Sequence, residues 1–144
     1  MKISEIMIKD VKTIKKGGSM KEAAQIMLDN NVGSIIVVND ITRKAIGVIT
    51  RTDILKLFLS EDFKSHEVPV DKFLKSKLIK VNPDDQSDVA TELFVKNKLH
   101  HLIVEDSEGK LVGVLSTLDI IDLLYHQNQS FPYFIPKEKK IKAI

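Results

Sequence analysis

Two aspartates occupy the same setting in two distant parts of the chain. Asp53 follows Thr50 by three residues, and Asp119 follows Ser116 by the same interval. Both pairs stand where a helix is predicted to begin, so each carboxylate suits helix capping and the positive end of the helix dipole. A carboxylate is equally suited to accept two charge-assisted hydrogen bonds from neighbouring hydroxyls of a ligand. The residues alone leave both roles open.

Basic and ionisable side chains accompany these pairs. Arg51 directly follows Thr50 and could add a bidentate contact to an anion held by free N–H groups at the helix start; the alternative is an exposed surface arginine. His100 and His101 are consecutive on a predicted strand, so their side chains point to opposite faces and cannot both chelate one metal ion. One of them could contact a phosphate, whose charge would favour the imidazolium.

These residues belong to a pattern that the chain contains twice. The run Ile46–Leu55 returns as Val112–Ile121, and Ile3–Met7 returns as Val70–Leu74. The offset is 67 residues up to the middle strand and 66 after it. A tandem repeat of this size predicts two similar units related by a pseudo-twofold axis, with the seam between them as the natural place for a site. The repeated Gly47 could admit a ligand to the backbone or relieve crowding.

Each copy is predicted to contain a short helix, a short strand, a helix, two strands and a closing helix. In the first copy Ser19 begins a helix, with Glu22 as its capping-box partner, and Asn30-Asn31 ends it. Strands are expected at Ser34–Val38 and Ala45–Ile49. The closing helix is expected to bury Ile54, Leu55 and Phe58.

The second copy follows the same order. Its helix is expected to bury Val89, Ala90, Leu93 and Phe94, and its two strands are expected at Leu102–Glu105 and Leu111–Leu115. This order predicts an α+β fold in which a small sheet with helices on one side occurs twice. The two units are expected to pack through their sheets, since each alone, near 60 residues, would be marginally stable.

The composition limits the classes of function. With 43% hydrophobic and 29% charged residues the chain is typical of a folded soluble protein. No apolar run could cross a bilayer, so we expect no membrane partner, and the absence of cysteine fits a cytoplasmic location. A net charge of +2 gives little support for nucleic-acid binding. Phosphate-loop, dinucleotide and nucleophile-elbow motifs are absent, so we do not expect an enzyme.

The tandem copy, the order of elements and the signature Gly-hydrophobic-hydrophobic-Thr/Ser-x-x-Asp resemble the cystathionine-beta-synthase (CBS) domain, of which two copies form a Bateman module. The signature is present at Gly47–Asp53 and again at Gly113–Asp119. The resemblance covers about residues 1–125. It implies two CBS-type β-α-β-β-α units, and we place them with their connections at 1–59 (first repeat), 60–69 (linker), 70–125 (second repeat) and 126–144 (tail).

Members of this family bind adenosyl ligands (AMP, ADP, ATP, S-adenosylmethionine, sometimes NAD) in clefts between the repeats. They act as sensors and commonly form homodimers. The resemblance implies that Asp53 and Asp119 hold ribose hydroxyls with help from Thr50 and Ser116, and that the His100-His101 pair meets phosphates. Arg51, from its place at the helix start, is the other candidate for a phosphate contact. It also implies ligand contacts from the first short strand and from the start of the middle strand, namely Thr13, Ile14, Lys80, Val81, Gly33, Ser34, Ile35, His100, His101 and Leu102.

The resemblance implies no resident cofactor or metal, only a regulatory adenosyl nucleotide, and an effector protein that receives the signal. Many family members carry proline where this chain has Ile36 and Ile103, so the identity of the ligand does not carry over. Because the two copies differ in sequence, we expect unequal sites. The competing interpretation is an interaction scaffold with empty clefts, in which Asp53 and Asp119 serve only as caps.

Overall fold

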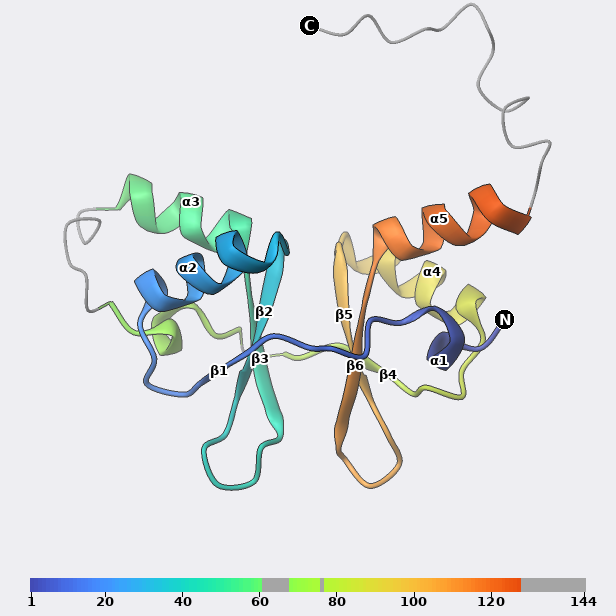
Figure 1. The fold of residues 1–144 in the computed structure, drawn as a ribbon, viewed down its shortest axis with the longest axis horizontal. Helices are drawn as coiled ribbons and strands as arrows, with labels where there is room; N and C mark the ends of the chain where they lie inside the picture. Colours follow the sequence, from blue (N-terminus) through green and yellow to red (C-terminus); the bar gives the residue numbers. More distant parts are fainter. Residues whose placement is uncertain (61–67, 76, 128–144) are drawn as a thin grey trace, which may run out of the picture.

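The computed structural model describes residues 1–60, 68–75 and 77–127. The expected tail, apart from its first two residues, and most of the expected linker lie outside these ranges. Within them the predicted order of elements is confirmed in both copies (Figure 1). The first copy contains α1 (Ile3–Ile6), β1 (Thr13–Lys15), α2 (Met20–Asn30), β2 (Ser34–Val38), β3 (Ala45–Thr50) and α3 (Arg51–Leu59). The second contains η2 (Val70–Phe73), β4 (Lys80–Val81), α4 (Ser87–Asn97), β5 (His101–Glu105), β6 (Leu111–Ser116) and α5 (Thr117–Gln127).

Each copy forms its own three-stranded sheet, so the fold is α+β. The strand orders are β1-β2-β3 and β4-β5-β6, with a parallel pair followed by an antiparallel pair in each. The register repeats as well, since Thr13 lies opposite Ile36 and Lys80 lies opposite Ile103. The pairing therefore preserves the correspondence of the sequence copies residue by residue.

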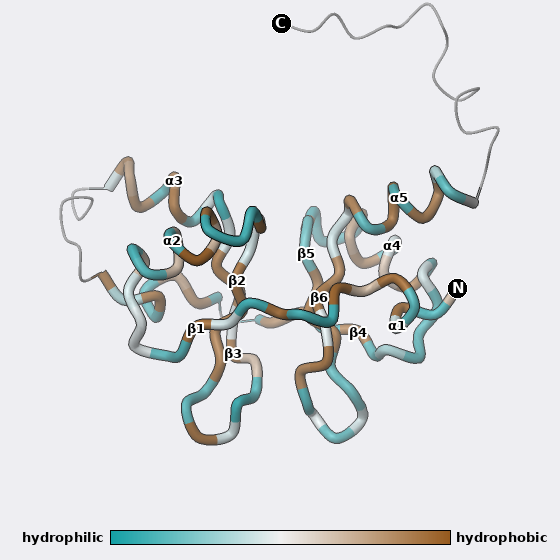
Figure 2. Tube along the Cα trace, in the orientation of Figure 1, coloured by the Kyte–Doolittle hydropathy of each residue, from teal (hydrophilic) through white to brown (hydrophobic). Residues whose placement is uncertain are grey.

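The two sheets pack against each other through apolar side chains. Ile36, Val38 and Ala45 of the first copy form a buried cluster with Ile103 of the second. Figure 2 shows hydrophobic residues along the strands of both sheets. The expected packing of the units through their sheets is confirmed.

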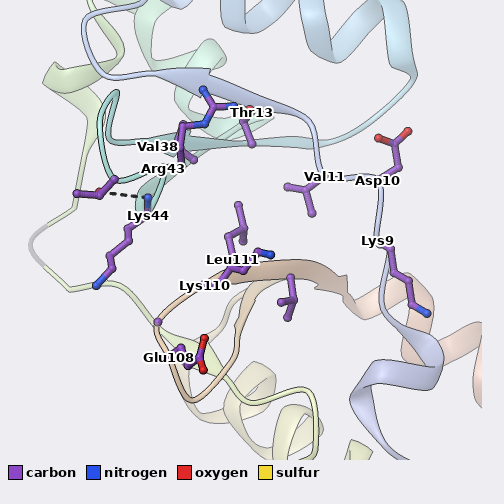
Figure 3. Close-up of a pocket in the computed structure, with 13 residues that line it drawn as sticks. Lys9, Asp10, Val11, Thr13, Val38, Arg43, Lys44, Glu108, Lys110 and Leu111 are labelled. Atoms are coloured by element: carbon purple, nitrogen blue, oxygen red, sulfur yellow. Dashed lines mark hydrogen bonds between the residues drawn. The ribbon is translucent and has the colours of Figure 1, made fainter.

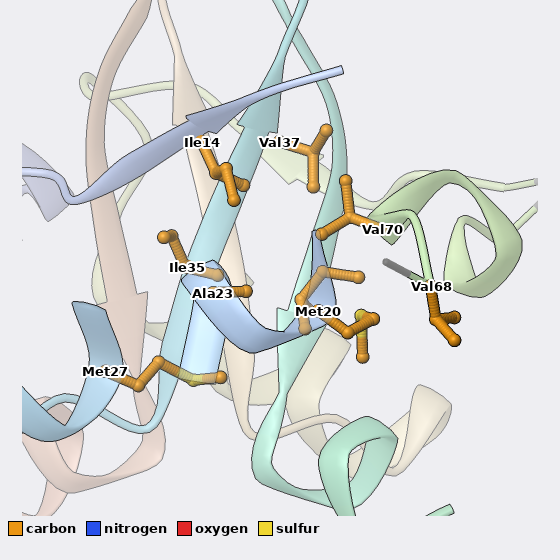
Figure 4. Close-up of a cluster of buried hydrophobic side chains, with 9 residues drawn as sticks. Ile14, Met20, Ala23, Met27, Ile35, Val37, Val68 and Val70 are labelled. Atoms are coloured by element: carbon orange, nitrogen blue, oxygen red, sulfur yellow. The ribbon is translucent and has the colours of Figure 1, made fainter. Parts of the chain in front are cut away.

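The short helices at the start of each copy are exchanged between the copies. Ile3 of α1 is buried with Val81 and Phe94 of the second copy, and its N–H donates to Asp85 O at 2.9 Å. Reciprocally, Val70 is buried among the first-copy residues Ile14, Met20 and Val37 (Figure 4), and its N–H donates to Gly18 O at 2.8 Å. Each hydrophobic core therefore contains a piece of both copies.

This exchange explains the glycine of the repeated signature. A Cβ on Gly47 would overlap the Leu74 side chain, and a Cβ on Gly113 would lie 2.5 Å from Met7 Sδ. Met7 and Leu74 stand at equivalent positions just after the exchanged helices. Of the two roles left open by the sequence, the structure supports the relief of crowding.

The expected inner faces of two helices were partly wrong. Leu55 and Phe58 of α3 are 63% and 60% exposed, whereas Ile54 and Leu57 pack on the core. The inward face of α3 contains residues 53, 54 and 57, and it includes the buried carboxylate of Asp53. In α4, Val89 is exposed while Ala90 and Phe94 are buried and Leu93 is partly buried.

Candidate ligand-binding site

Both signature aspartates cap the helix that they begin. The N–H and the hydroxyl of Thr50 donate to Oδ2 of Asp53 at 2.8 and 3.2 Å. The N–H and the hydroxyl of Ser116 donate to Oδ2 of Asp119 at 2.7 and 2.9 Å. Oδ1 of each aspartate makes no hydrogen bond with the residues that the structure describes. In each carboxylate, Oδ2 caps the helix and Oδ1 has no hydrogen-bond donor among the described residues.

The strand pairing places the start of each middle strand beside these caps. Ser34 lies opposite Thr50, and His101 lies opposite Ser116. The residue before each strand accepts the first helical amide: Arg51 N donates to Gly33 O at 3.3 Å, and Thr117 N donates to His100 O at 3.0 Å. One of the N–H groups expected to serve an anion at each helix start is therefore already used.

A contact across the seam joins Gly33, Arg51 and His101. A Cβ on Gly33 would lie 3.4 Å from Cζ of Arg51 and 3.5 Å from Nε2 of His101. Because Gly33 has no side chain, the guanidinium and the imidazole both occupy the space above it. Arg51 comes from the first copy and His101 from the second, so this cluster exists only when the two copies are packed together.

His101 is the imidazole of this cluster, and its surroundings disfavour the protonated form. Burial lowers its pKa below the ordinary value of 6.5, and the neighbouring His100 and Arg51 lower the pKa further, while Asp119 acts in the opposite direction. Its Nδ1 is buried and has no hydrogen-bond partner among the described residues. A buried ring nitrogen without a hydrogen-bond partner is costly, so the interior position of His101 is maintained by the packing of the two copies rather than by hydrogen bonding of Nδ1.

The two halves of the seam differ in chemistry. At the positions that correspond to Gly33, His101 and Arg51, the other copy carries His100, Ser34 and Thr117. Ser34 is buried and His100 is exposed. One half therefore presents a guanidinium beside an imidazole, and the equivalent half presents two hydroxyls and an exposed imidazole.

Several residues that the resemblance implied as ligand contacts have side chains committed elsewhere. The side chains of Ile14, Ile35, Val81 and Leu102 belong to the two hydrophobic cores, which leaves only their backbone for a ligand. Lys80 forms an ion pair at 2.9 Å with Glu105, a residue that the sequence did not single out.

Thr13 lines a cavity of about 600 Å³ that the sequence did not indicate. We call it the hairpin-end cavity. Its walls are the β2–β3 turn (Thr42–Lys44), the β5–β6 turn with the start of β6 (Glu108–Val112) and the crossing segment that includes Lys9–Val11 (Figure 3). No sequence signal indicates it, because its three walls come from separate parts of the chain.

The described residues limit other kinds of site. No group of three or more histidine, aspartate or glutamate side chains is arranged there to hold a metal ion. None of the helices in the described ranges has the length and apolarity required to cross a membrane.

A comparison with protein families identifies the two copies. The model of the CBS domain matches residues 3–60 and again residues 70–126. This chain belongs to the CBS domain family. The two matches coincide with the two packed sheets and their helices, so the protein is a tandem CBS pair.

Relatives of this CBS pair include short proteins and much longer enzymes. An uncharacterised 17.7 kDa protein of Acidianus ambivalens is 32% identical over 119 residues, which are 83% of this chain and 70% of that protein. The inosine-5'-monophosphate dehydrogenase of Aquifex aeolicus is 34% identical over 116 residues, which are 80% of this chain but 23% of the enzyme. An uncharacterised protein of Methanocaldococcus jannaschii is likewise matched over only 42% of its length.

Solved structures share the fold of this CBS pair. A CBS domain protein of Pyrobaculum aerophilum complexed with AMP superposes with a TM-score of 0.77 at 23% identity, covering 89% of this chain and 100% of that chain. A CBS domain pair in complex with 5'-methylthioadenosine and S-adenosyl-L-methionine superposes with a TM-score of 0.78 at 22% identity, covering 89% of this chain and 98% of that chain.

Proposed function

We propose that this CBS pair is a regulatory module that binds an adenosyl ligand at the seam between its repeats. The observation that carries the proposal concerns the carboxylates of Asp53 and Asp119: Oδ2 caps the helix, and Oδ1 makes no hydrogen bond with a described residue. An open carboxylate oxygen next to a capped helix start is suited to accept hydrogen bonds from ribose hydroxyls. The complexes of similarly folded CBS pairs with AMP and with S-adenosyl-L-methionine support this choice of ligand class.

The charged end of the ligand is assigned to the cluster of Gly33, Arg51 and His101. The guanidinium can form a bidentate contact with a phosphate, and Nε2 of His101, which lies beside Gly33, is placed to add a further polar contact. The equivalent half carries Ser34 and Thr117 instead. On this proposal the two sites are unequal: the half with Arg51 prefers phosphorylated ligands, and the other half tolerates uncharged adenosyl compounds.

The surface through which the module contacts other proteins is assigned to the exposed faces of α3 and α5. Apolar stretches run along both helices in Figure 2, and the exposed side chains include Leu55 and Leu59 of α3 and Leu118, Ile121 and Tyr125 of α5. These faces suit a homodimer contact, which would remove the apolar surface from water. A ligand at the seam could bias the packing of the repeats and so pass a signal to an effector protein.

Calorimetric titration with AMP, ADP, ATP, S-adenosylmethionine and NAD tests the proposal, using Asp53→Asn and Asp119→Asn. Asparagine can keep an oxygen for the capping bond while it replaces the open acceptor by an amide donor. We expect folded variants with affinity reduced by roughly tenfold or more at the altered site. Asp85→Asn is the control, because Asp85 accepts the N–H of the residue three positions earlier, Asn82, at 3.0 Å, and it lies outside the repeated signature.

The scaffold interpretation predicts a different result. If none of the five ligands produces heat or raises the melting temperature, and both variants behave as wild type, the carboxylates are caps alone. The exposed apolar faces of α3 and α5 would then point to protein partners as the main function.

A further inference from the structure

The hairpin-end cavity lies at the opposite end of the molecule from the starts of α3 and α5. Figure 1 shows both hairpin turns projecting away from the helices, and Figure 3 shows the space between these turns and the crossing segment. Its volume of about 600 Å³ lies in the range of small-molecule sites. The signature aspartates and Arg51 do not line it, so it is separate from the seam site.

The wall of this cavity carries an excess of positive charge. Lys9, Arg43, Lys44 and Lys110 line it, and none of them forms an ion pair with a described residue. Of the two lining acids, Asp10 is already paired with Lys12 at 2.9 Å, which leaves Glu108. Cations from three separate segments that share one concave space attract an anion more strongly than the same cations scattered over a surface.

The floor of the cavity is apolar. Val38 is 2% exposed and belongs to the cluster between the two sheets, against which Val11 and Leu111 also pack. Thr13 and Thr42 are also among the lining residues. Charged walls with polar hydroxyls above an apolar floor suit a small molecule that carries a phosphate on an apolar or ring-shaped body.

Two of the residues that line the cavity have repeat equivalents of a different chemical type. The repeat equivalents of Thr13 and Val38 are Lys80 and Glu105. Their side chains form an ion pair at 2.9 Å, where the first copy has a small polar and an apolar side chain. The two copies therefore differ in the chemistry of their side chains at this pair of positions.

Arg43, one of the cations that line the cavity, has a strained backbone conformation. Arg43 has φ of 61°, in the left-handed region that favours glycine, and its N–H donates to Asn39 O at 3.0 Å. A residue with a Cβ is less stable in this conformation than glycine would be. The strain is compatible with a functional use of the Arg43 side chain.

We propose that the hairpin-end cavity is a second ligand site, which binds a small phosphorylated metabolite independently of the seam. Arg43, Lys44 and Lys110 contact the phosphate, and the floor around Val11 and Leu111 contacts the body of the ligand. The adenosyl ligand and the phosphorylated metabolite then bind at opposite ends of the same pair of sheets.

Nuclear magnetic resonance of the full chain tests the proposal with inorganic pyrophosphate and phenyl phosphate as probes. Both should shift the amides of residues 42–44 and 108–112, and phenyl phosphate should in addition shift the methyl groups of Val11 and Leu111. The double variant Arg43→Gly/Lys110→Gln should bind at least about tenfold more weakly. Glycine suits the left-handed conformation, so this variant is expected to fold.

Two controls distinguish binding in this cavity from a general charge effect and from binding at the seam. Lys21→Gln/Lys56→Gln removes the same number of charges from exposed helix positions and should leave probe affinity unchanged. Arg51→Ala should likewise retain the shifts at the hairpin turns. Shifts confined to Arg51 and His101, no shifts at the hairpin turns, or equal weakening in the lysine control would each overturn the proposal.

Discussion

Asp53 and Asp119 each hold a helix start with one carboxylate oxygen and leave the other oxygen without a described partner. Around them the copies differ at single positions. Arg51 and His101 lie beside Gly33, where no side chain separates them. The equivalents of Arg51, His101 and Gly33 in the other copy are Thr117, Ser34 and His100. On the proposed function, the aspartates, which both copies share, contact the ribose that all adenosyl ligands contain. The neighbouring residues that differ between the copies contact the groups by which these ligands differ.

Arg51→Ala should separate these two contributions. We expect affinity for AMP to fall by roughly 10- to 100-fold, because a hydrogen bond to a charged group is worth about 1.5–3 kcal/mol. Binding of adenosine should change little, because adenosine has no phosphate. Calorimetric titration of both compounds measures the difference, and Lys56→Ala, an exposed cation on the same helix, serves as control. Equal losses for AMP and adenosine would contradict the assignment of phosphate to Arg51.

His101 should make the stability of the fold depend on pH. Its pKa is lowered in the folded protein, first by burial, so between that value and 6.5 the unfolded chain binds more protons. The free energy of unfolding should therefore fall as the pH drops below about 6.5, with a slope of at most about 1.4 kcal/mol per pH unit from this group. Urea titrations at pH 8 to 5 should show this slope reduced in His101→Gln and retained in His126→Gln, which alters an exposed histidine.

At the scale of elements, the tandem copy was enough to predict the order, the strands and the capped helix starts. The copies share one pattern of turns and apolar runs, so each supports the interpretation of the other. The inner face of α3 was not predictable in the same way. Leu55 and Phe58 have the spacing of core residues, but the inward face of the helix contains Ile54 and Leu57 together with the buried Asp53. Local sequence does not reveal that an aspartate is buried.

The exposed face that results should mediate self-association. Leu55 and Ile121 occupy equivalent positions on α3 and α5 and are 63% and 50% exposed. We expect wild type to sediment as a dimer and Leu55→Lys/Ile121→Lys as a monomer, because lysine would place charge in an apolar contact. Leu28→Lys, at a 78% exposed leucine of α2, should leave the dimer intact. A monomeric wild type, or an unaffected double variant, would argue against this interface.

Two further features lay beyond the sequence because they depend on distant contacts. The role of Gly47 is set by Leu74, which reaches it only through the exchange of short helices. The hairpin-end cavity combines residues near positions 10, 43 and 110, none of which belongs to the repeated signature. Among the candidate seam residues, Thr50, Arg51, Asp53, Ser116, Thr117 and Asp119 belong to that signature or border it. Gly33 and His101 lie outside it and were indicated by the family resemblance, and the ligand contacts of all these residues stay predictions.

At the scale of the whole molecule, the exchange of α1 and η2 makes each core depend on both copies. Ile3→Ala should lower the free energy of unfolding by about 2–4 kcal/mol, because Ile3 is fully buried. Amide protection should fall most in α4 and β5 of the second copy. Val70→Ala is the mirror-image control and should act on α2 and β2. Hydrogen exchange of both variants distinguishes this pattern from a uniform loss, which would contradict the dependence described here.

The exchange also decides where mechanical load enters the molecule. Residue 1 emerges beside α1, which lies against the second copy and contacts α5, and the described chain ends with α5 itself (Figure 1). Both ends of the described chain therefore lie at the second copy, and the first copy is joined to it by the exchanged helices and the contact between the sheets. A force applied between residues 1 and 127 would act first on α1 and α5 and would reach the first copy through these shared contacts.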